Sequence, residues 1–408
     1  MTSKLLAFDL HDSSTLNGLR SLGATIHIGH SNENLDNADL VIKSSAIPAN
    51  NPELEAAQNQ GIPILERAAA LAELMIGTRS VAVAGTHGKT TTTSLIVHIL
   101  TEAKLDPTYV IGGIINATGM NAKLGKSDYL IAEADESDAS FLHLQPMLSV
   151  ITNIDEDHMG TYKHNYKNLI DAFISFTSNL PFYGVCIACI DDQGVKDILN
   201  KIHRPIMSYG FSDDADVRAF NVEQKKMQML FDVSCSKYQK NFPVTLNLIG
   251  KHNILNALAA ISVAIELKIK PKIIQQALSN FSGVSRRLDY HQALTINQKP
   301  IPLFDDYGHH PNEIEAVLST LRDTFPMNRL IVIFQPHRYS RTRDLFNEFV
   351  SCLSKVDVLI LLNIYSANEA PINTISSSTL ADSIRRRSSI DPIVAKNSSE
   401  IVEILPNV

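Results

Sequence analysis

The chain has 408 residues, of which 36 are Lys or Arg and 43 are Asp or Glu, so its formal net charge at pH 7 is −7. A pI near 6.1 argues against a protein that mainly coats nucleic acid or an anionic membrane. Hydrophobic residues make up 44% and charged residues 19%, which excludes a disordered chain and a long coiled coil. The length predicts about two to four domains.

The cysteine content and the lengths of the apolar runs indicate the cellular compartment. Four cysteines are too few for a disulfide framework and are typical of reduced thiols in the cytoplasm. Cys186 and Cys189 form one C-x-x-C pair inside the apolar run GVCIACI, so we expect a buried strand rather than a zinc site. The N-terminus has too short an apolar stretch for a signal peptide, and no run approaches the roughly 20 apolar residues of a membrane span. The sequence predicts a cytoplasmic globular protein without nucleic-acid or membrane partners.

The first block, residues 1–77, alternates short apolar runs with helical patterns. Strands are predicted at 4–10, 24–29, 38–45 and 62–66, with helices around 13–22 and from Asn51. Strand–helix–strand alternation is typical of βαβ units, so this block predicts a parallel sheet.

The second block, residues 78–288, opens with the strand SVAVAG. Further buried strands are predicted at 128–134, 148–154, 184–190 and 205–211, antiparallel strands within 220–248, and a long helix from His252. The third block, residues 289–408, returns to the α/β pattern, with strands at 302–308, 329–336 and 356–365 and helices from Pro311 and Thr342. The fold class predicted from these patterns is α/β.

The strongest local signal is VAGTHGKTTTT at residues 83–93, where a strand ends, a loop with two glycines turns and a helix begins. Glycines let backbone N–H groups approach phosphate oxygens, and the helix N-terminus adds partial positive charge. The strict pattern G-x-x-x-x-G-K-[ST] is not met, because Val83 replaces its first glycine. The loop still predicts binding of nucleotide phosphates, and the residues that form it are Gly85, Thr86, His87, Gly88, Lys89, Thr90 and Thr91.

Two residues of this loop have specific expected partners. Lys89 should contact the β- and γ-phosphates and the Thr90 hydroxyl should contact Mg²⁺. We expect Lys89 to be a loop charge rather than a core contact, so its removal should change stability little.

Carboxylates follow two of the predicted parallel strands, at the edge where nucleotide and metal sites collect. Glu133 ends one strand and is followed by Asp135, Glu136 and Asp138. The next strand ends in the cluster Asp155-Glu156-Asp157-His158. We expect both strand ends to converge with the phosphate loop on one site.

Six segments, in order, resemble the Mur ligases of peptidoglycan synthesis: GTHGKTTTT, EADESDASFLHLQP, TNIDEDHM, GKHNILNALAA, DDYGHHP and FQPHRYSRTRDLF. The resemblance covers nearly the whole chain. It implies a partial Rossmann-like UDP-sugar domain (1–77), a central P-loop ATPase-type domain with a mostly parallel sheet (78–288), and a Rossmann-like C-terminal domain (289–408). It also implies a reaction in which ATP activates a carboxylate as an acyl phosphate, which an amine then attacks.

The resemblance implies roles for individual residues. Thr90 and Glu133 look like Mg²⁺ ligands, and His158 should lie near a second metal or the acyl phosphate. Arg287, rather than Arg286, looks like the arginine that reaches the ATP phosphates. The implied catalytic residues are Lys89, Glu133, His158, Arg287 and Asp306, and the implied adenine and phosphate contacts on the long helix are His252, Asn253 and Asn256. Asn253 could instead cap that helix.

The amino-acid pocket is expected in the last block. Arg338 and Arg341, three apart, suit a clamp for the amino-acid carboxylate, a basic surface loop being the alternative. Tyr307, His309 and His337 should complete the pocket and keep it small. A small pocket favours L-alanine, with serine or glycine as alternatives. The implied substrates are L-alanine, UDP-N-acetylmuramate and ATP, bound by a monomer or homodimer.

The chain departs from the family pattern at both ends. The G-x-G-G-x-G-M turn that opens the family's first domain is not found, and the final glycine-rich strand and helix are also missing. Asp9, Ser44 and Ser45 remain as the implied UDP-sugar contacts. We therefore expect a shortened chain that binds ATP·Mg²⁺ far better than the UDP-sugar.

Two other functions stay open. A recycling ligase would attach an intact tripeptide to the same nucleotide sugar, but ESDASFLHLQP and the small pocket argue against it. A non-catalytic ATP-binding remnant is the second alternative, although the ATP-side motifs are complete. A P-loop kinase or GTPase would leave the histidine and arginine motifs of the last block unexplained.

Overall fold

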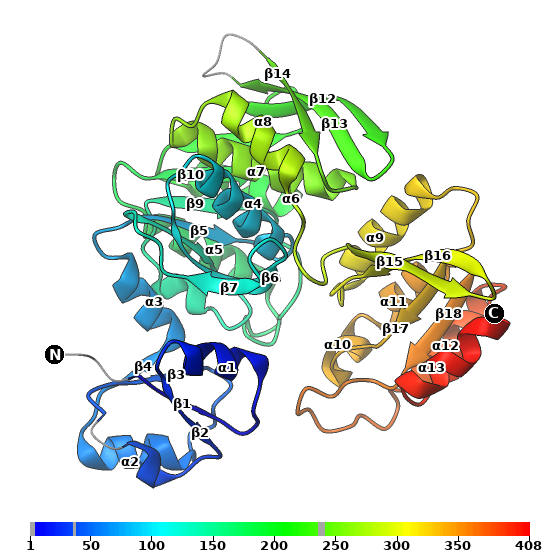
Figure 1. Cartoon of the computed structure of the whole chain (residues 1–408), viewed down its shortest axis with the longest axis horizontal. Helices are drawn as coiled ribbons and strands as arrows, with labels where there is room; N and C mark the ends of the chain where they lie inside the picture. The colour runs from blue at the N-terminus through cyan, green and yellow to red at the C-terminus, as the bar shows by residue number, and fades with distance from the viewer. Residues whose placement is uncertain (1–4, 36–37, 236–240) are drawn as a thin grey trace.

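The computed structural model describes residues 5–35, 38–235 and 241–408. Figure 1 shows three units: an N-terminal unit from β1 to α3, a central unit from β5 to α8, and a C-terminal unit from β15 onward. The α/β class with three parts is confirmed. The domain boundaries after residues 77 and 288 stay predictions. No helix within the described residues combines the length and the apolar character needed to cross a membrane.

The N-terminal unit contains short strands with helices between them. Its elements are β1 (Leu6–Asp9), α1 (Ser14–Ser21), β2 (Thr25–Ile28), the 3₁₀ turn η1 (Asn32–Leu35), β3 (Val41–Lys43), α2 (Pro52–Gln60), β4 (Ile64–Glu66) and α3 (Arg67–Met75). β1 pairs in parallel with β2, and β3 with β4, as two separate sheets. The predicted parallel pairing is therefore confirmed, but the strands form two small sheets rather than a single one. Strands of three or four residues form short ladders, and Leu35, Ala56 and Ala57 are the buried apolar core beneath them. Lys4, the first residue of the expected first strand, lies outside the described residues.

The central unit is built on a ten-stranded sheet with the order β14-β13-β12-β11-β10-β9-β5-β8-β6-β7. Its strands are β5 (Arg79–Ala84), β6 (Thr108–Ile115), β7 (Met120–Lys123), β8 (Tyr129–Glu133), β9 (Leu148–Ile151), β10 (Val185–Cys189), β11 (Ile206–Gly210), β12 (Val217–Lys225), β13 (Gln228–Cys235) and β14 (Phe242–Leu246). The strands from β12 to β14 pair antiparallel, as does β6 with β7, and the other pairs are parallel. The antiparallel segment expected within 220–248 is thus confirmed, although it begins three residues earlier.

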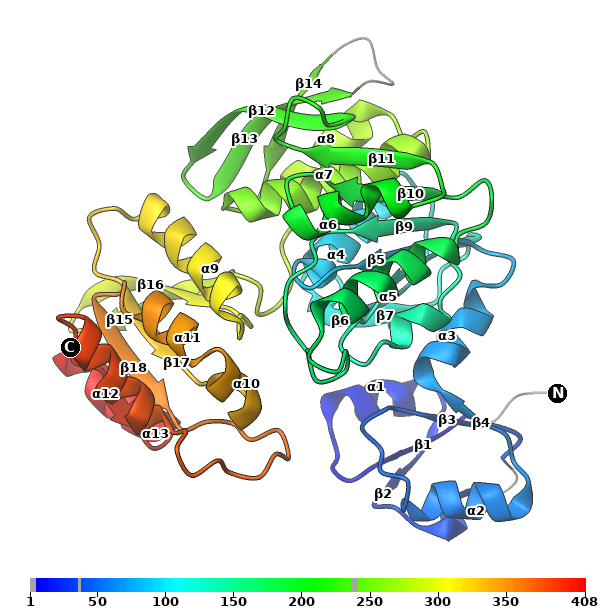
Figure 2. The same cartoon turned by 180° about the vertical axis from the view of Figure 1, so that it is seen from behind.

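Helices cover both faces of this sheet. They are α4 (Lys89–Glu102), α5 (Tyr166–Ser178), α6 (Gln193–Ile198), α7 (Lys251–Glu266) and α8 (Pro271–Asn280), with 3₁₀ turns η2 (Ser140–His143) and η3 (Leu199–Lys201). Figure 1 shows α4, α7 and α8 on one face, and Figure 2 shows α5 on the other. Successive strand residues point to opposite faces, so Val81 and Val83 join one core while Ala82 and Ala84 join the second. This double burial explains why β5 is apolar throughout.

The two cysteines of the C-x-x-C pair lie in β10, as expected for a buried strand. Cys189 packs in the core beneath α4 and α7, whereas Cys186 packs in the core beneath α5. Burial raises the pKa of each thiol to about 11. An odd spacing sends the side chains to opposite faces of the sheet, so they are not arranged to share one metal ion.

The C-terminal unit combines a hairpin with a small parallel sheet. Its elements are β15 (Asp289–Ile296), β16 (Lys299–Asp305), α9 (Pro311–Thr324), β17 (Ile331–Phe334), α10 (Tyr339–Asp344), α11 (Phe346–Leu353), β18 (Val358–Leu362), α12 (Ser377–Arg387), β19 (Ile393–Ala395), α13 (Ser398–Ile404) and the 3₁₀ turn η4 (Leu405–Asn407). β17, β18 and β19 are parallel. The helix expected from Thr342 begins at Tyr339 instead, because Glu369 accepts hydrogen bonds from the Ser340 backbone N–H and hydroxyl and fixes the first turn.

Candidate active site

Three neighbouring strands of the central sheet end at one edge. β5 lies between β8 and β9, with Val83 opposite Glu133 and Ala84 opposite Ile151. Because all three strands are parallel, the phosphate loop and the two acidic segments emerge side by side. The expected convergence of these strand ends is confirmed.

The phosphate loop turns tightly between β5 and α4 at two glycines with positive φ. Gly85 has φ of 134°, and a Cβ there would lie 2.0 Å from the Thr152 Oγ1 atom. Gly88 has φ of 81°, and a Cβ there would lie 2.4 Å from Asn256 Oδ1. α4 begins without a cap from any described side chain, so its first-turn N–H groups remain directed at an incoming anion.

The Lys89 side chain is only 14% exposed, which corrects the expectation of a surface charge. Its Nζ donates to the carbonyls of Gly85 and Thr86 at 2.8 and 3.0 Å, and it lies 2.7 Å from Glu136 Oε2. The Glu136 side chain is 2% exposed, and burial raises its pKa to about 7. Burial opposes the charge on Lys89, but Glu136, Glu133 and Asp135 together outweigh it, so the pKa of Lys89 lies above its ordinary value. Removing the ammonium would therefore affect stability as well as phosphate binding.

Thr90 and Glu133 form a site made of oxygen ligands. The Thr90 hydroxyl donates to both carboxylate oxygens of Glu133 at 3.0 and 3.1 Å, and the Gly112 N–H donates to Glu133 Oε2 at 2.7 Å. Oxygen ligands of this kind fit Mg²⁺. Among the described residues, no hydrogen bond joins His158 to this pair. His158 instead faces Asp157, with 3.4 Å between Nε2 and Oδ2, and burial lowers the pKa of His158.

The first turn of α7 closes over the phosphate loop. Asn256 Oδ1 accepts from the Thr92 hydroxyl at 3.2 Å, and its Nδ2 donates to Asn253 Oδ1 at 3.1 Å. Asn253 in turn donates to the Ile249 carbonyl and does not cap the helix, whose N-cap is Gly250. The capping alternative for Asn253 is therefore wrong. His252 precedes this pair, and burial lowers its pKa to about 4.

Arg287 lies at the connection between the central and C-terminal units. Its guanidinium lies 5.3 Å from the centre of the Tyr307 ring and 3.8 Å from Glu313 Oε1. Arg286 is more exposed, at 59%, and pairs with Asp305. Asp306 accepts from the backbone N–H groups of Leu288 and Gly308, each at 2.6 Å, so its carboxylate organises the chain next to Arg287.

Aromatic rings line the expected amino-acid pocket. Tyr307 packs edge-to-face on His309 at 5.3 Å, His309 lies 6.0 Å from His337, and His337 lies 5.2 Å from Tyr365. Burial lowers the pKa of His309 to about 4 and also lowers that of His337. Tyr365 was not predicted from the sequence, since it lies in the loop after β18.

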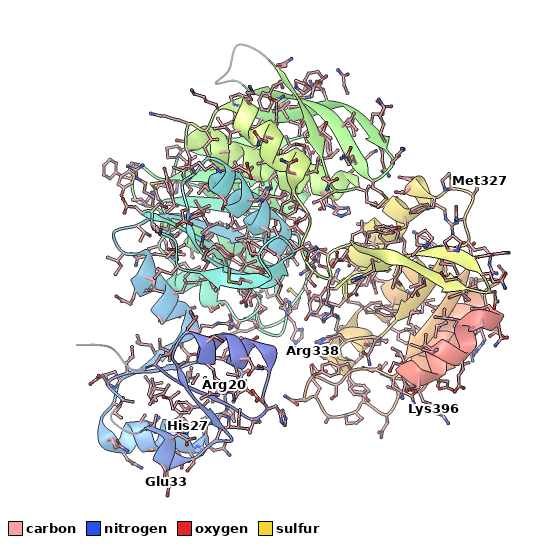
Figure 3. The ribbon with its side chains drawn as sticks, viewed as in Figure 1. Arg20, His27, Glu33, Met327, Arg338 and Lys396 are labelled. Carbon is pink, nitrogen blue, oxygen red and sulfur yellow. The ribbon has the colours of Figure 1, made fainter. Side chains whose placement is uncertain are left out.

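The two arginines of the expected clamp differ in environment. The Arg341 side chain is 7% exposed, and its Nη2 lies 3.6 Å from Asp157 Oδ2 of the central unit. Its Nε is buried with no partner in the described part of the chain. Arg338 is exposed, with φ of 72°. Figure 3 shows Arg338 at the beginning of α10, on the side toward the N-terminal unit. The clamp itself stays a prediction.

A cavity of about 300 Å³ lies between the central and C-terminal units. It is lined by the expected ATP contacts His87, Gly88, Thr91, His252, Asn253, Asn256 and Arg287, and also by Asp306 and Glu313. The phosphate loop, the start of α7 and the start of α9 thus face one space, as a nucleotide site between two units requires.

The three parts of the chain match three family models. They are the Mur ligase family catalytic domain at residues 8–79, the Mur ligase middle domain at 83–264 and the Mur ligase glutamate ligase domain at 286–406. A UDP-N-acetylmuramate–L-alanine ligase of Vesicomyosocius okutanii is 61% identical over 98% of this chain and 85% of its own length. One from Methylococcus capsulatus is 50% identical over 98% of this chain and 84% of its own length. The chain belongs to the Mur ligase family.

Solved structures of Mur ligases have the same architecture. The crystal structure of UDP-N-acetylmuramate–alanine ligase from Thermotoga maritima aligns with a TM-score of 0.81 at 25% identity, covering 98% of this chain and 86% of that one. A UDP-N-acetylmuramate:L-alanyl-γ-D-glutamyl-meso-diaminopimelate ligase from Neisseria meningitidis aligns with a TM-score of 0.63 at 26% identity, covering 69% of this chain and 91% of that one.

The N-terminal unit of this Mur ligase approaches the central unit through the Ser44–Ser45 loop. Although burial opposes the shift, hydrogen bonds from Ser140 and Ser45 lower the pKa of Asp138, which follows β8. Asp9 lies at the end of β1, where its carboxylate accepts from the His11 N–H at 3.2 Å. Ser45 therefore lies next to the acidic segment, whereas UDP-sugar binding by Asp9, Ser44 and Ser45 stays a prediction.

Several residues at this Mur ligase site were not predicted from the sequence. Glu136 was seen only as one of a run of acids, and nothing in that run distinguishes the buried carboxylate. Glu313 could have been identified from the sequence, because it lies three positions after His310, the N-cap of α9, and completes a capping box there. Asn312, which donates to Asp155, gave no such signal.

Proposed function

We propose that this Mur ligase is an ATP-dependent enzyme that joins L-alanine to the carboxylate of UDP-N-acetylmuramate through an acyl phosphate, in peptidoglycan precursor synthesis. The observation that carries the proposal is the meeting of phosphate-side and amino-acid-side residues at one junction between units. The 50–61% identity to relatives named for this reaction supports the choice of substrates.

The site's own charges suit phosphoryl transfer to a carboxylate. Lys89, Arg287 and the N-terminus of α4 would bind the phosphates and offset the repulsion between the γ-phosphate and the substrate carboxylate. Thr90 and Glu133 would hold Mg²⁺, which when bound supplies further positive charge at the phosphates. Arg338 and Arg341 would orient L-alanine by its carboxylate, leaving its amine free to attack.

Neutral imidazoles surround the expected position of the amine. Burial lowers the pKa values of His158, His309 and His337, so these rings are uncharged near pH 7. An uncharged ring can accept a hydrogen bond or a proton from an ammonium group, which an imidazolium cannot do. Such a setting favours the free amine, the form that attacks an acyl phosphate.

The tripeptide-recycling reaction is the closest alternative. The row of rings formed by Tyr307, His309, His337 and Tyr365 favours a small amino acid over a peptide. As accompanying properties we propose ATP and Mg²⁺ as cofactors, a cytoplasmic location, and a monomer or homodimer.

Phosphate release from ATP tests the substrate assignment. Every reaction contains the full chain, ATP, Mg²⁺ and UDP-N-acetylmuramate. One also contains L-alanine, one contains the tripeptide L-Ala-γ-D-Glu-meso-diaminopimelate, and one contains neither. We expect phosphate release and a ligated product with L-alanine alone. Turnover with the tripeptide only would assign the recycling reaction, and ATP binding without turnover under any condition would favour the non-catalytic alternative.

Glu133→Gln is expected to weaken Mg²⁺ dependence more than UDP-sugar binding. The amide keeps the shape of the side chain but removes the charge that a hard divalent cation prefers. The measurement is a Mg²⁺ titration of activity, with Glu156→Gln as an exposed control on the neighbouring loop. An unchanged titration would move the metal to other ligands, with Asp135 and Asp138 next in line.

A further inference from the structure

Glu313 connects the C-terminal unit to the phosphate loop of the central unit. It is the third residue of α9, and its side chain is 14% exposed. Its Oε1 lies 3.3 Å from His87 Nδ1 and 3.8 Å from Arg287 Nη1. One carboxylate oxygen thus faces a phosphate-loop side chain and the arginine at the junction of the two units.

The other oxygen of Glu313 is fixed by its own helix. Oε2 accepts from the backbone N–H groups of His309 and His310, at 3.0 and 3.3 Å, in the capping box that begins α9. A carboxylate at a helix N-terminus is stabilised by the partial positive charge there. The position of Glu313 is therefore set within the C-terminal unit, so any movement of that unit carries the carboxylate with it.

His87 lies between two carboxylates from different units. Its Nδ1 faces Glu313, and its Nε2 lies 3.2 Å from Oδ2 of Asp155, which follows β9. Asp155 also accepts from the Asn312 side chain of α9. Among the residues that the structure describes, the other titratable groups around His87 are His310, whose ring centre lies 5.0 Å away, and Asp192 at the start of α6. Burial alone would lower the pKa of His87, but the hydrogen bonds to Asp155 and Glu313 outweigh it and raise the pKa to about 9.

These contacts explain a cluster that otherwise has the spacing of a metal site. One atom from each of His87, Asp155 and His310 lies within 4.8 Å of the others. Both ring nitrogens of His87 face carboxylates, so both act as donors, and His310 Nδ1 accepts from the Asn312 N–H. A ring that donates from both nitrogens has no lone pair for a metal. The cluster is accounted for by hydrogen bonds between the two units.

We propose that Glu313 is a positioning residue, which holds His87 and Arg287 and thereby couples closure of the C-terminal unit to the arrangement of the phosphate loop. The inference rests on the proposed function, because the positioned groups face the expected phosphates. When the C-terminal unit moves away, His87 loses a partner from that unit and Arg287 loses its nearest carboxylate. ATP binding and closure of the C-terminal unit should then favour each other, since energetic coupling between two binding or conformational events is reciprocal.

The central test compares Glu313→Gln with Glu315→Gln on the same helix. The Glu315 side chain is 43% exposed and pairs with Lys355 instead of with the central unit. Histidine-labelled NMR of the ligand-free full chain follows the His87 titration, assigned with His87→Asn. Without one of its two carboxylates, His87 should lose its proton at lower pH, so we expect the midpoint to fall by at least about one pH unit in Glu313→Gln, which is about tenfold in proton affinity. Glu315→Gln should leave the midpoint unchanged.

A second readout uses the enzyme reaction. In the parent, His87 is a cation below about pH 9 and loses its charge above it. The alkaline fall of kcat/KM for ATP should therefore begin at lower pH in Glu313→Gln and stay in place in Glu315→Gln. In a His87→Asn background, Glu313→Gln should cause no further shift of the alkaline pH profile, because the ring through which Glu313 shifts the profile is gone. A shift that persists without His87 would overturn the proposal.

A third readout does not require Glu313 to be altered. All four native cysteines are buried, so spin labels at exposed Lys126→Cys and Arg387→Cys would report the distance between the central and C-terminal units. His87→Asn leaves the capping box of α9 intact and should broaden that distance distribution in the ligand-free chain. An unchanged distribution, or an unchanged His87 titration in Glu313→Gln, would overturn the coupling. Neither measurement needs turnover, so failure of the proposed reaction would be seen separately.

Discussion

Lys89→Met is expected to reduce ligation by at least about 10³-fold, because no other side chain replaces the ammonium opposite the transferring phosphate. The same change should also lower the free energy of unfolding. Glu136 is buried and the Lys89 side chain is only 14% exposed, with 2.7 Å between Nζ and Oε2, so removing the cation leaves a buried carboxylate without its partner. Breaking a buried pair in this way typically costs about 3 kcal/mol. Steady-state ligation and urea unfolding measure the two effects.

A double substitution separates those two effects. Glu136→Gln in the Lys89→Met chain removes the unpaired carboxylate and should recover most of the lost stability, yet ligation should stay lost. Lys126→Met, at an exposed position, serves as the control and should change neither quantity. A single Lys89→Met variant that made product at more than about a tenth of the parent rate would contradict the phosphate role.

Arg341→Ala is expected to raise the KM for L-alanine strongly while leaving that for ATP nearly unaltered. A bidentate guanidinium–carboxylate pair in a desolvated pocket is worth about 2–4 kcal/mol, which corresponds to roughly 30- to 1,000-fold in KM. Arg341 is buried against Asp157, so its fork is already held in position before the amino acid binds. Initial rates with each substrate varied in turn would measure the two constants.

Arg343→Ala provides a matched control for this prediction. Arg343 lies two residues further along α10, is about half exposed and pairs with Asp344. The Arg343→Ala change should leave the KM for L-alanine and the KM for ATP close to those of the parent. If Arg341→Ala raised the KM for ATP alone, Arg341 would belong to the phosphate site and the clamp would be assigned wrongly.

The sequence alone determined the parts of the site that are contiguous in the chain. Glycines before a Lys-Thr pair define a strand–loop–helix turn, because their backbone conformations are set by local sterics. Glu133 and the cluster after Ile151 follow apolar strands, and parallel strands bring their carboxyl ends to one edge. Arg287 was chosen over Arg286 by family resemblance alone, and its lower exposure and its contact with Glu313 agree with that choice.

Tertiary structure alone decided which charged side chains pair. Glu136 lies 47 positions from Lys89, and Asn312 lies 157 positions from Asp155. No periodicity or turn signal encodes such pairs, since they depend on how helices and loops from separate units pack together. Packing then sets their chemistry. It makes Lys89 a structural as well as an expected phosphate-binding residue, and it places His87 between two carboxylates that hold the ring as a cation although burial opposes the charge. The sequence could name the residues around the phosphates, but their partners and protonation states follow from desolvation and distance, which exist only once the chain has folded.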